Sequence, residues 1–223
     1  MIYANENVAT RWYKKILDFF FPRSFLVKEL ERMRPEDFLE KTAPADVLPQ
    51  IWTRSIVKYS DPFAQTLVWE IKYRGNRKLA RLAAEMLHGE IVAYAAEKDY
   101  GLSEKPVLVI PVPASRHRIK ERGFNQCDLI TEEIQKIDGG RFCRVSSEIL
   151  KKTRNTQSQT KKNRRERMKN LSGCFAVAKP EEVLDQTVII IDDVITTGAT
   201  VTEARKILLK SGAKEVTALS IAH

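Results

Sequence analysis

The stretch Val188–Thr200, VIIIDDVITTGAT, decides how the rest of the chain is interpreted. Four branched apolar residues lead into Asp192 and Asp193, and a short loop of threonine, glycine and alanine follows. An apolar run of this length, bounded by turn residues, is typical of a buried strand in a parallel sheet. Gly198 allows a tight turn, and Ala199–Leu209 has helical spacing. The stretch therefore predicts a strand, a loop and a helix, with two acids at the carboxyl end of the strand.

The chain from Tyr59 onward alternates between predicted strands and predicted helices. Helices are expected at Pro62–Arg74, Arg77–Glu97, Asn125–Lys136 and Ala199–Leu209, and strands at Val107–Pro113, Arg141–Ser146, Val188–Asp193 and Val216–Ala222. This alternation predicts an α/β fold, a mostly parallel twisted sheet with helices on both faces. Ligands bind such sheets beyond the carboxyl ends of the strands, so the loops after Pro113 and Asp193 are expected to share one site.

Residues 1–58 have a different character. They contain clustered prolines, two short amphipathic pieces and no glycine. We predict a small helical or irregular N-terminal segment over 1–58 and one larger domain over 59–223.

Composition narrows the class of protein. The chain has 223 residues, of which 43% are hydrophobic and 30% charged, as in ordinary globular proteins. No apolar run is long enough to cross a membrane, and the N-terminus lacks the order of a signal peptide. Cys127, Cys143 and Cys174 are too far apart for a zinc site or a disulfide framework. We expect a cytoplasmic protein without membrane insertion.

Positive charge is concentrated in one segment. Lys151–Lys169 holds nine basic residues and one acid, a net +8 out of the formal +9 of the whole chain. Such a block favours an anionic partner, either a phosphorylated small molecule or a nucleic acid. A solvated basic loop that only aids solubility is the alternative.

The loop and the two aspartates are suited to bind different groups of one ligand. The free amides at a helix start favour phosphate, and the loop expected to hold it consists of Val194, Ile195, Thr196, Thr197, Gly198, Ala199 and Thr200. An ionised aspartate only accepts hydrogen bonds, so Asp192 and Asp193 need hydroxyls or a cation. Ribose 5-phosphate offers both a phosphate and hydroxyls. A magnesium ion is expected near the two aspartates, held through water or the ligand.

Other sites with paired acids fit less well. A nucleotide-binding site of the Walker type would need a G-x-x-x-x-G-K-[ST] segment, which the chain lacks. A phospho-acceptor pocket would not explain the threonine-rich loop. A purely structural turn remains the plainest alternative.

The whole stretch resembles the phosphoribosyl pyrophosphate (PRPP) motif of type I phosphoribosyltransferases. Pro111–Gln126, PVPASRHRIKERGFNQ, and the segments on either side of it are similar to the ComF family, whose members are linked to competence and DNA uptake. The resemblance covers about Tyr59–His223. It implies the type I phosphoribosyltransferase fold, PRPP with Mg²⁺, and displacement of pyrophosphate by an unidentified nitrogen acceptor. It also implies a homodimer, since type I relatives often form dimers.

The resemblance assigns further residues. The pyrophosphate is expected on Ala114, Ser115, Arg116, His117, Arg118 and Arg122. A flexible loop within Thr153–Lys162 would close over the ribose, with Thr156, Gln159, Lys161 and Lys162 in it. Arg154 is expected to act in catalysis beside Asp192 and Asp193.

The N-terminal segment of this chain departs from the family pattern. Family members often carry an N-terminal zinc module with paired cysteines, but here Ser24 stands at the expected cysteine and no C-x-x-C follows. We therefore expect no zinc and interpret 1–58 as the degenerate counterpart of that module.

The alternative function is a competence protein that binds single-stranded DNA and keeps the PRPP site as a sensor or relic. The basic block contains no aromatic residue for base stacking.

Overall fold

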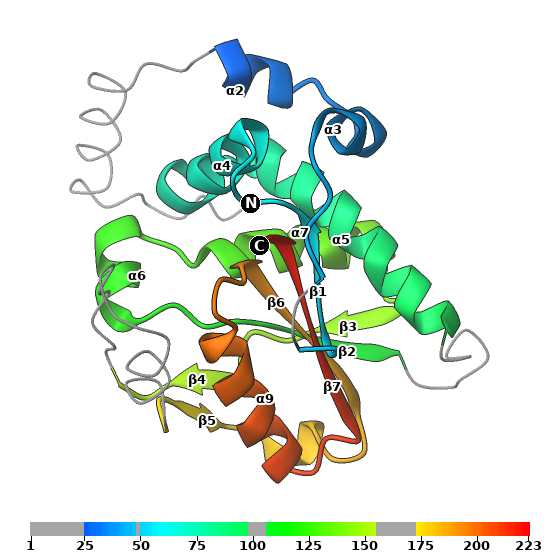
Figure 1. Ribbon diagram of the computed structural model, residues 1–223. Helices are drawn as coiled ribbons and strands as arrows, with labels where there is room; N and C mark the ends of the chain where they lie inside the picture. The colour runs from blue at the N-terminus through cyan, green and yellow to red at the C-terminus, as the bar shows by residue number, and fades with distance from the viewer. Residues whose placement is uncertain (1–24, 48–49, 98–105, 155–172) are drawn as a thin grey trace.

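A parallel five-stranded sheet forms the centre of the molecule (Figure 1). The computed structural model describes residues 25–47, 50–97, 106–154 and 173–223. The strands run in the order β1-β7-β6-β2-β3, and every neighbouring pair is parallel. They are β1 (Thr53–Val57), β2 (Val107–Pro111), β3 (Cys143–Val145), β6 (Thr187–Val194) and β7 (Glu215–Ala222). A separate antiparallel pair joins β4 (Leu150–Lys152) to β5 (Phe175–Val177).

Helices connect the strands. They are α2 (Phe25–Leu30), α3 (Pro35–Lys41), α4 (Pro62–Trp69), the π-helical turn η1 (Glu70–Arg74), α5 (Arg77–Glu97), α6 (Arg116–Arg122), α7 (Gln126–Asp138), the 3-10 turn η3 (Pro180–Glu182) and α9 (Ala199–Lys210). Asp61 and Asn125 cap α4 and α7, each side chain accepting a hydrogen bond from a backbone amide of the first turn. Over the described ranges we find no helix with the length and apolar character of a membrane span.

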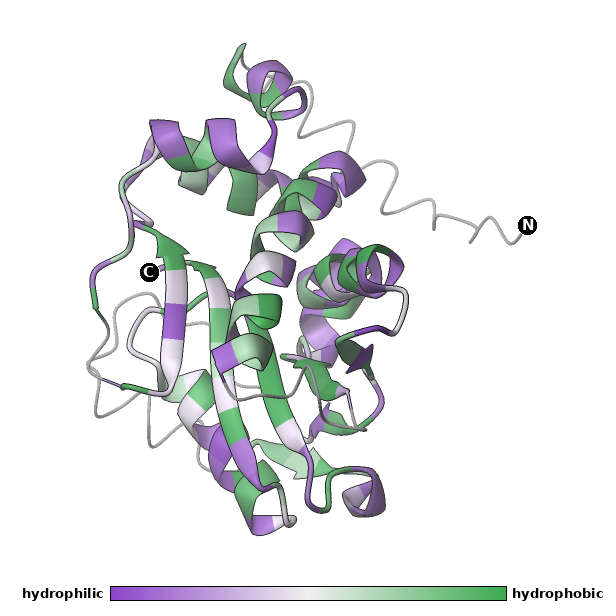
Figure 2. Cartoon of the chain, turned by 90° about the vertical axis from the view of Figure 1, so that its right-hand side faces the viewer, coloured by the Kyte–Doolittle hydropathy of each residue, from purple (hydrophilic) through white to green (hydrophobic). Residues whose placement is uncertain are grey.

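Alternation along the strands builds two cores, one on each face of the sheet. Val109, Ile189 and Leu219 face the core formed with α4, α5 and α7, whereas Leu108 and Ile190 face the core that includes α9. Figure 2 shows hydrophobic residues along the strands, while the helices carry both hydrophobic and hydrophilic residues. The predicted architecture, a parallel sheet with helices on both faces, is confirmed.

Two elements differ from the expectation. β1 lies within residues 1–58, where we expected helical or irregular structure, and it pairs with β7. Its sequence, TRSIV, shows no apolar run because β1 is an edge strand, where Arg54 reaches out to pair with Glu97 at 2.7 Å. The sheet therefore includes residues before Tyr59, and the division at 58 stays a prediction. The second is α6, which occupies part of the expected pyrophosphate loop.

The order of the strands places a crevice between β2 and β6. The chain leaves β2 toward β3 on one side and leaves β6 toward β7 on the other, so the two following loops diverge. Ligands bind open α/β sheets at such a switch point. The pairing continues to its mouth, where the amide of Val112 donates to the carbonyl of Ile191 at 2.9 Å.

Candidate functional site

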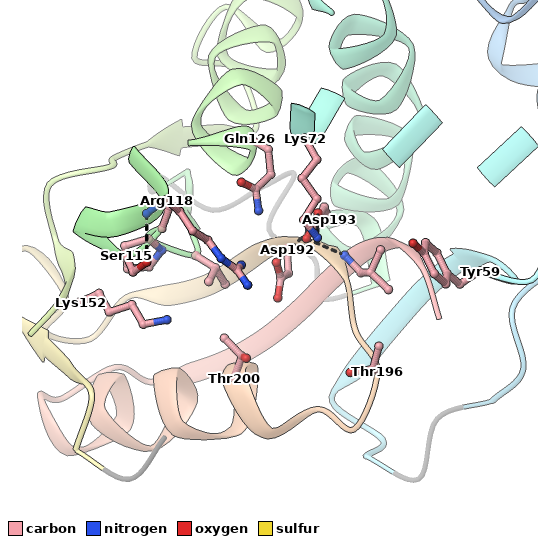
Figure 3. A pocket seen from close by; sticks show the side chains of 14 residues that line it. Tyr59, Lys72, Ser115, Arg118, Gln126, Lys152, Asp192, Asp193, Thr196 and Thr200 are labelled. Atoms are coloured by element: carbon pink, nitrogen blue, oxygen red, sulfur yellow. Dashed lines mark hydrogen bonds and ion pairs between the residues drawn. The ribbon is translucent and has the colours of Figure 1, made fainter. Parts of the chain in front are cut away.

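A cavity of about 260 Å³ opens at the carboxyl ends of β2 and β6 (Figure 3). It is lined by Tyr59, Lys72, Val112, Pro113, Ala114, Ser115, Arg118, Gln126, Lys152, Asp192, Asp193, Val194, Thr196 and Thr200. The two loops expected to share one site therefore both contribute to it. The lining combines two buried acids with three cationic side chains, those of Lys72, Arg118 and Lys152.

Asp192 and Asp193 lie near the carboxyl end of β6 and point to opposite faces of the strand, because side chains alternate along it. Asp193 extends toward the core side that carries η1, where its Oδ2 lies 3.3 Å from the ammonium of Lys72. Apart from this ion pair, Oδ2 of Asp193 accepts no hydrogen bond from the described residues. Oδ1 of Asp192 accepts from the Asp193 amide at 2.9 Å and from the Cys127 thiol at 3.6 Å.

The different neighbours give the two acids different charges. Burial, aided by the charge of Asp193, raises the pKa of Asp192 to about 8. Burial pushes the pKa of Asp193 upward, but the ammonium of Lys72 and hydrogen bonds from Asp192 and the Val194 amide together leave that pKa below its ordinary value. Near neutral pH, Asp193 is thus an ionised acceptor and Asp192 holds a proton that it can donate.

The loop from β6 into α9 has the shape expected for an anion site. Gly198 has φ +72°, and a Cβ there would lie 3.0 Å from Nε2 of Gln50. The twelve-residue helix α9 begins at the next residue, which brings its free N-terminal amides to the loop. Of the seven residues predicted for this loop, Val194, Thr196 and Thr200 line the cavity. Ile195 is buried.

The loop after β2 brings only half of its predicted residues to the cavity. Ala114, Ser115 and Arg118 line it. Arg116 and His117 do not, because α6 begins there and turns them outward, with the His117 side chain 79% exposed. The Ser115 hydroxyl caps α6 by accepting from the Arg118 amide at 3.3 Å.

Arg122, one turn further along α6, lies in the interior. Its guanidinium stacks over the Tyr73 ring at 4.7 Å and donates to the Gln126 side chain at 3.3 Å. Arg122 is 4% exposed and does not line the cavity, so its contacts hold α6 and α7 to η1.

The predicted flexible loop lies mainly outside the described residues, and this includes Thr156, Gln159, Lys161 and Lys162. Arg154 is described: it is exposed, donates to the Gly173 carbonyl at 3.3 Å and does not line the cavity.

Several lining residues were not predicted. Lys72 and Tyr59 lie more than a hundred residues before the aspartates, and no local motif marks them. Lys152 belongs to the basic block, but the sequence does not separate it from its neighbours. In the structure it emerges from β4, over the Phe175 ring at 5.7 Å, and burial lowers the pKa of its ammonium. Gln126 was noted only within the family motif.

The acid pair suits a magnesium ion that is held mainly by its ligand and by water. Carboxylate oxygens are the donors that Mg²⁺ prefers. Asp192, Asp193 and Cys127 gather their ligand atoms within 4.8 Å, but a thiol is no magnesium ligand and Lys72 already pairs with Asp193. The donor set therefore leaves few places for direct coordination.

Comparison with known proteins finds a matching domain family and similar solved structures. Residues 135–222 match the Phosphoribosyl transferase domain family. Among solved structures, the allosteric regulatory enzyme of purine biosynthesis aligns with 69% of this chain and 30% of its own, at a TM-score of 0.38 and 17% identity.

Relatives found among curated proteins share more sequence identity with this chain than that structure does. The DNA utilization protein YhgH of Escherichia coli O6:H1 is 32% identical over 170 residues, which cover 75% of this chain and 71% of YhgH. Competence protein F of Haemophilus influenzae is 28% identical over 77% of this chain and 73% of its own. The chain therefore belongs to the ComF family of competence-associated proteins with a phosphoribosyltransferase-like domain.

Proposed function

We propose that the protein binds PRPP and transfers its phosphoribosyl group to a nitrogen acceptor. The observation that carries the proposal is that an ionised carboxylate, a helix N-terminus and three cationic side chains meet at one cavity. PRPP has a diol, a 5-phosphate and a pyrophosphate. The carboxylate is complementary to the diol, the helix N-terminus to the 5-phosphate and the cationic side chains to the pyrophosphate.

The sugar end fits the β6 side of the cavity. The 5-phosphate would accept from the loop amides before α9 and from the hydroxyls of Thr196 and Thr200. The ribose hydroxyls would donate to Asp193 and exchange hydrogen bonds with Asp192. Mg²⁺, when bound with PRPP, would supply positive charge to the pyrophosphate oxygens.

The leaving group fits the β2 side. Arg118 and Lys152 would neutralise the pyrophosphate, while Ser115 lies at the start of α6 beside it. A lone pair on the acceptor nitrogen forms the new bond to C1 of the ribose, and the C1–oxygen bond breaks with its electrons on the departing pyrophosphate. No enzyme nucleophile is needed, since pyrophosphate is a good leaving group.

Calorimetry of PRPP binding with Mg²⁺ tests the proposal. The double variant Asp192→Asn/Asp193→Asn is expected to bind about 100-fold more weakly, since the charge-assisted contact of Asp193 and the hydrogen bond of the Asp192 carboxyl are both lost. Asp37→Asn/Asp46→Asn is the matched control, because both of its acids are exposed surface residues. Absence of PRPP binding by the wild type would reject the proposal.

Binding of single-stranded DNA is a second candidate. The names of the relatives refer to DNA utilization and competence, and Lys151–Lys169 carries a net charge of +8. Neutralising Lys161, Lys162, Arg164 and Arg165 should lower both DNA affinity and its salt dependence. If the block serves PRPP alone, the wild type will not retain single-stranded DNA at all.

A further inference from the structure

Lys72 brings a positive charge into the ribose end of the cavity from a distant part of the chain. It belongs to η1, and its ammonium reaches Asp193 across 3.3 Å (Figure 3). Within the described residues it is the one cationic side chain that pairs with either aspartate of the site. Both carboxylates are more than nine-tenths buried, so a neighbouring charge acts on them with little screening.

The turn that carries Lys72 is anchored on both sides. Ile71 is fully buried in the core, and the buried residues Glu70 and Arg74 pair at 3.2 Å. On the other side, the Tyr73 ring contacts Trp69 at 5.5 Å between centroids and lies under Arg122. A π-helical turn often marks a functional position. Because its neighbours are fixed, Lys72 is held toward the cavity before any ligand arrives.

We propose that Lys72 is a built-in cation of the ribose site, a positioning residue whose ammonium balances the buried carboxylate of Asp193 and holds it toward the sugar hydroxyls without help from a divalent metal. The inference rests on the proposed function. Lys72 touches Asp193, and Asp193 in turn accepts from the ribose. The ribose 5-phosphate end of the ligand should therefore bind without Mg²⁺, whose role is left to the pyrophosphate.

Removing the ammonium of Lys72 should make the binding of ribose 5-phosphate depend on Mg²⁺. In Lys72→Met, the ionised carboxylate of Asp193 would face the sugar without the ammonium that pairs with it. A divalent ion could then restore part of the lost balance. Lys72→Arg keeps the charge and should keep most of the binding. Lys78→Met is the matched control, because Lys78 is an exposed lysine six residues away that does not line the cavity.

Calorimetry with ribose 5-phosphate, in EDTA and in Mg²⁺, tests this inference, and PRPP with Mg²⁺ serves as the reference ligand. The wild type and Lys78→Met should bind ribose 5-phosphate equally in the two buffers. Lys72→Met should lose about tenfold or more in EDTA, as expected for one charge-assisted contact, and recover part of it in Mg²⁺. Lys72→Arg should stay within about threefold of wild type, because it keeps the charge.

Three results would overturn the inference. One is wild-type binding of ribose 5-phosphate that needs Mg²⁺. Another is a Lys72→Met protein that binds like wild type in EDTA. The third is an equal loss in the Met and Arg variants that Mg²⁺ does not repair, which with an unchanged thermal melt would indicate a steric role only. If the wild type binds neither ribose 5-phosphate nor PRPP, the proposed function fails first and the inference fails with it.

Discussion

The loops after β2 and β6 leave neighbouring strands at the same edge of the sheet, yet they bring different groups to the cavity. The β6 loop passes through a glycine turn into the start of α9, whose first backbone amides have no partner within the helix. The β2 loop presents side chains, and the turn of α6 selects which ones reach the cavity. Ser115 and Arg118, three residues apart, lie on the cavity side, whereas Arg116 and His117 point away. The backbone site, in the loop after β6, can therefore be predicted from a short motif. The side-chain site, in the loop after β2, depends on which face of α6 each residue occupies.

The strongest test of the backbone site is Gly198→Ala. An alanine at φ +72° is strained and approaches Gln50, so the loop must shift and its amides must turn away from the phosphate. We expect PRPP affinity to fall about 100-fold, the equivalent of two or more lost hydrogen bonds. Calorimetry with PRPP and Mg²⁺ measures the loss.

Gly139→Ala controls for backbone strain alone, because Gly139 has φ +64° with open space around it and ends α7 far from the loop. Both variants should lose about 1 kcal/mol of unfolding free energy in urea. Only Gly198→Ala should lose ligand affinity, and equal affinities in the two variants would show that the β6 loop does not bind through its backbone.

The side-chain site predicts a smaller effect that depends on position. Arg118→Ala should weaken PRPP binding about tenfold, since one cation facing the pyrophosphate is lost. Arg116→Ala, two residues earlier on the same helix, should stay within about twofold because exposed charges act weakly. Ribose 5-phosphate lacks the pyrophosphate and should bind both variants like wild type. A larger loss in Arg116→Ala would mean that α6 rearranges when the ligand binds.

The smallest expected effect concerns the acids that precede the β6 loop. The folded protein keeps the proton of Asp192 up to about pH 8, whereas the unfolded chain releases it near the ordinary value of 3.8. Between these values the unfolded state binds fewer protons, so Asp192 lowers stability as the pH rises. Asp192→Asn should therefore gain more unfolding free energy at pH 8 than at pH 7, by about 1 kcal/mol. Urea denaturation at both pH values measures the difference. An equal gain at both would contradict the raised pKa.

Local patterns predicted the parts of the fold that local forces determine. Arg77–Glu97 was predicted from its spacing and is α5 with the same bounds. The buried run before Asp192 was also predicted, and Asp61 and Asn125 cap α4 and α7 through backbone amides within a few positions.

The unpredicted parts depend on contacts made through space. β1 is recognisable only by its pairing with β7, because its own residues are largely polar. Lys72 enters the site from a helix whose sequence gives no sign of a distant aspartate. Arg122 matched a family motif and was expected to bind phosphate, but its position against Tyr73 follows from how α6 packs on η1.

The pairing of β1 with β7 has a consequence for how the protein is made. Ser55 and Ser220 share a hydrogen bond at 2.7 Å although 165 residues separate them, and the Tyr59 amide donates to the carbonyl of His223. During synthesis, β1 leaves the ribosome long before its partner exists, so it must wait unpaired. Contacts this distant in sequence slow folding. The cavity wall that Tyr59 contributes is therefore expected to be among the last parts of the site to form.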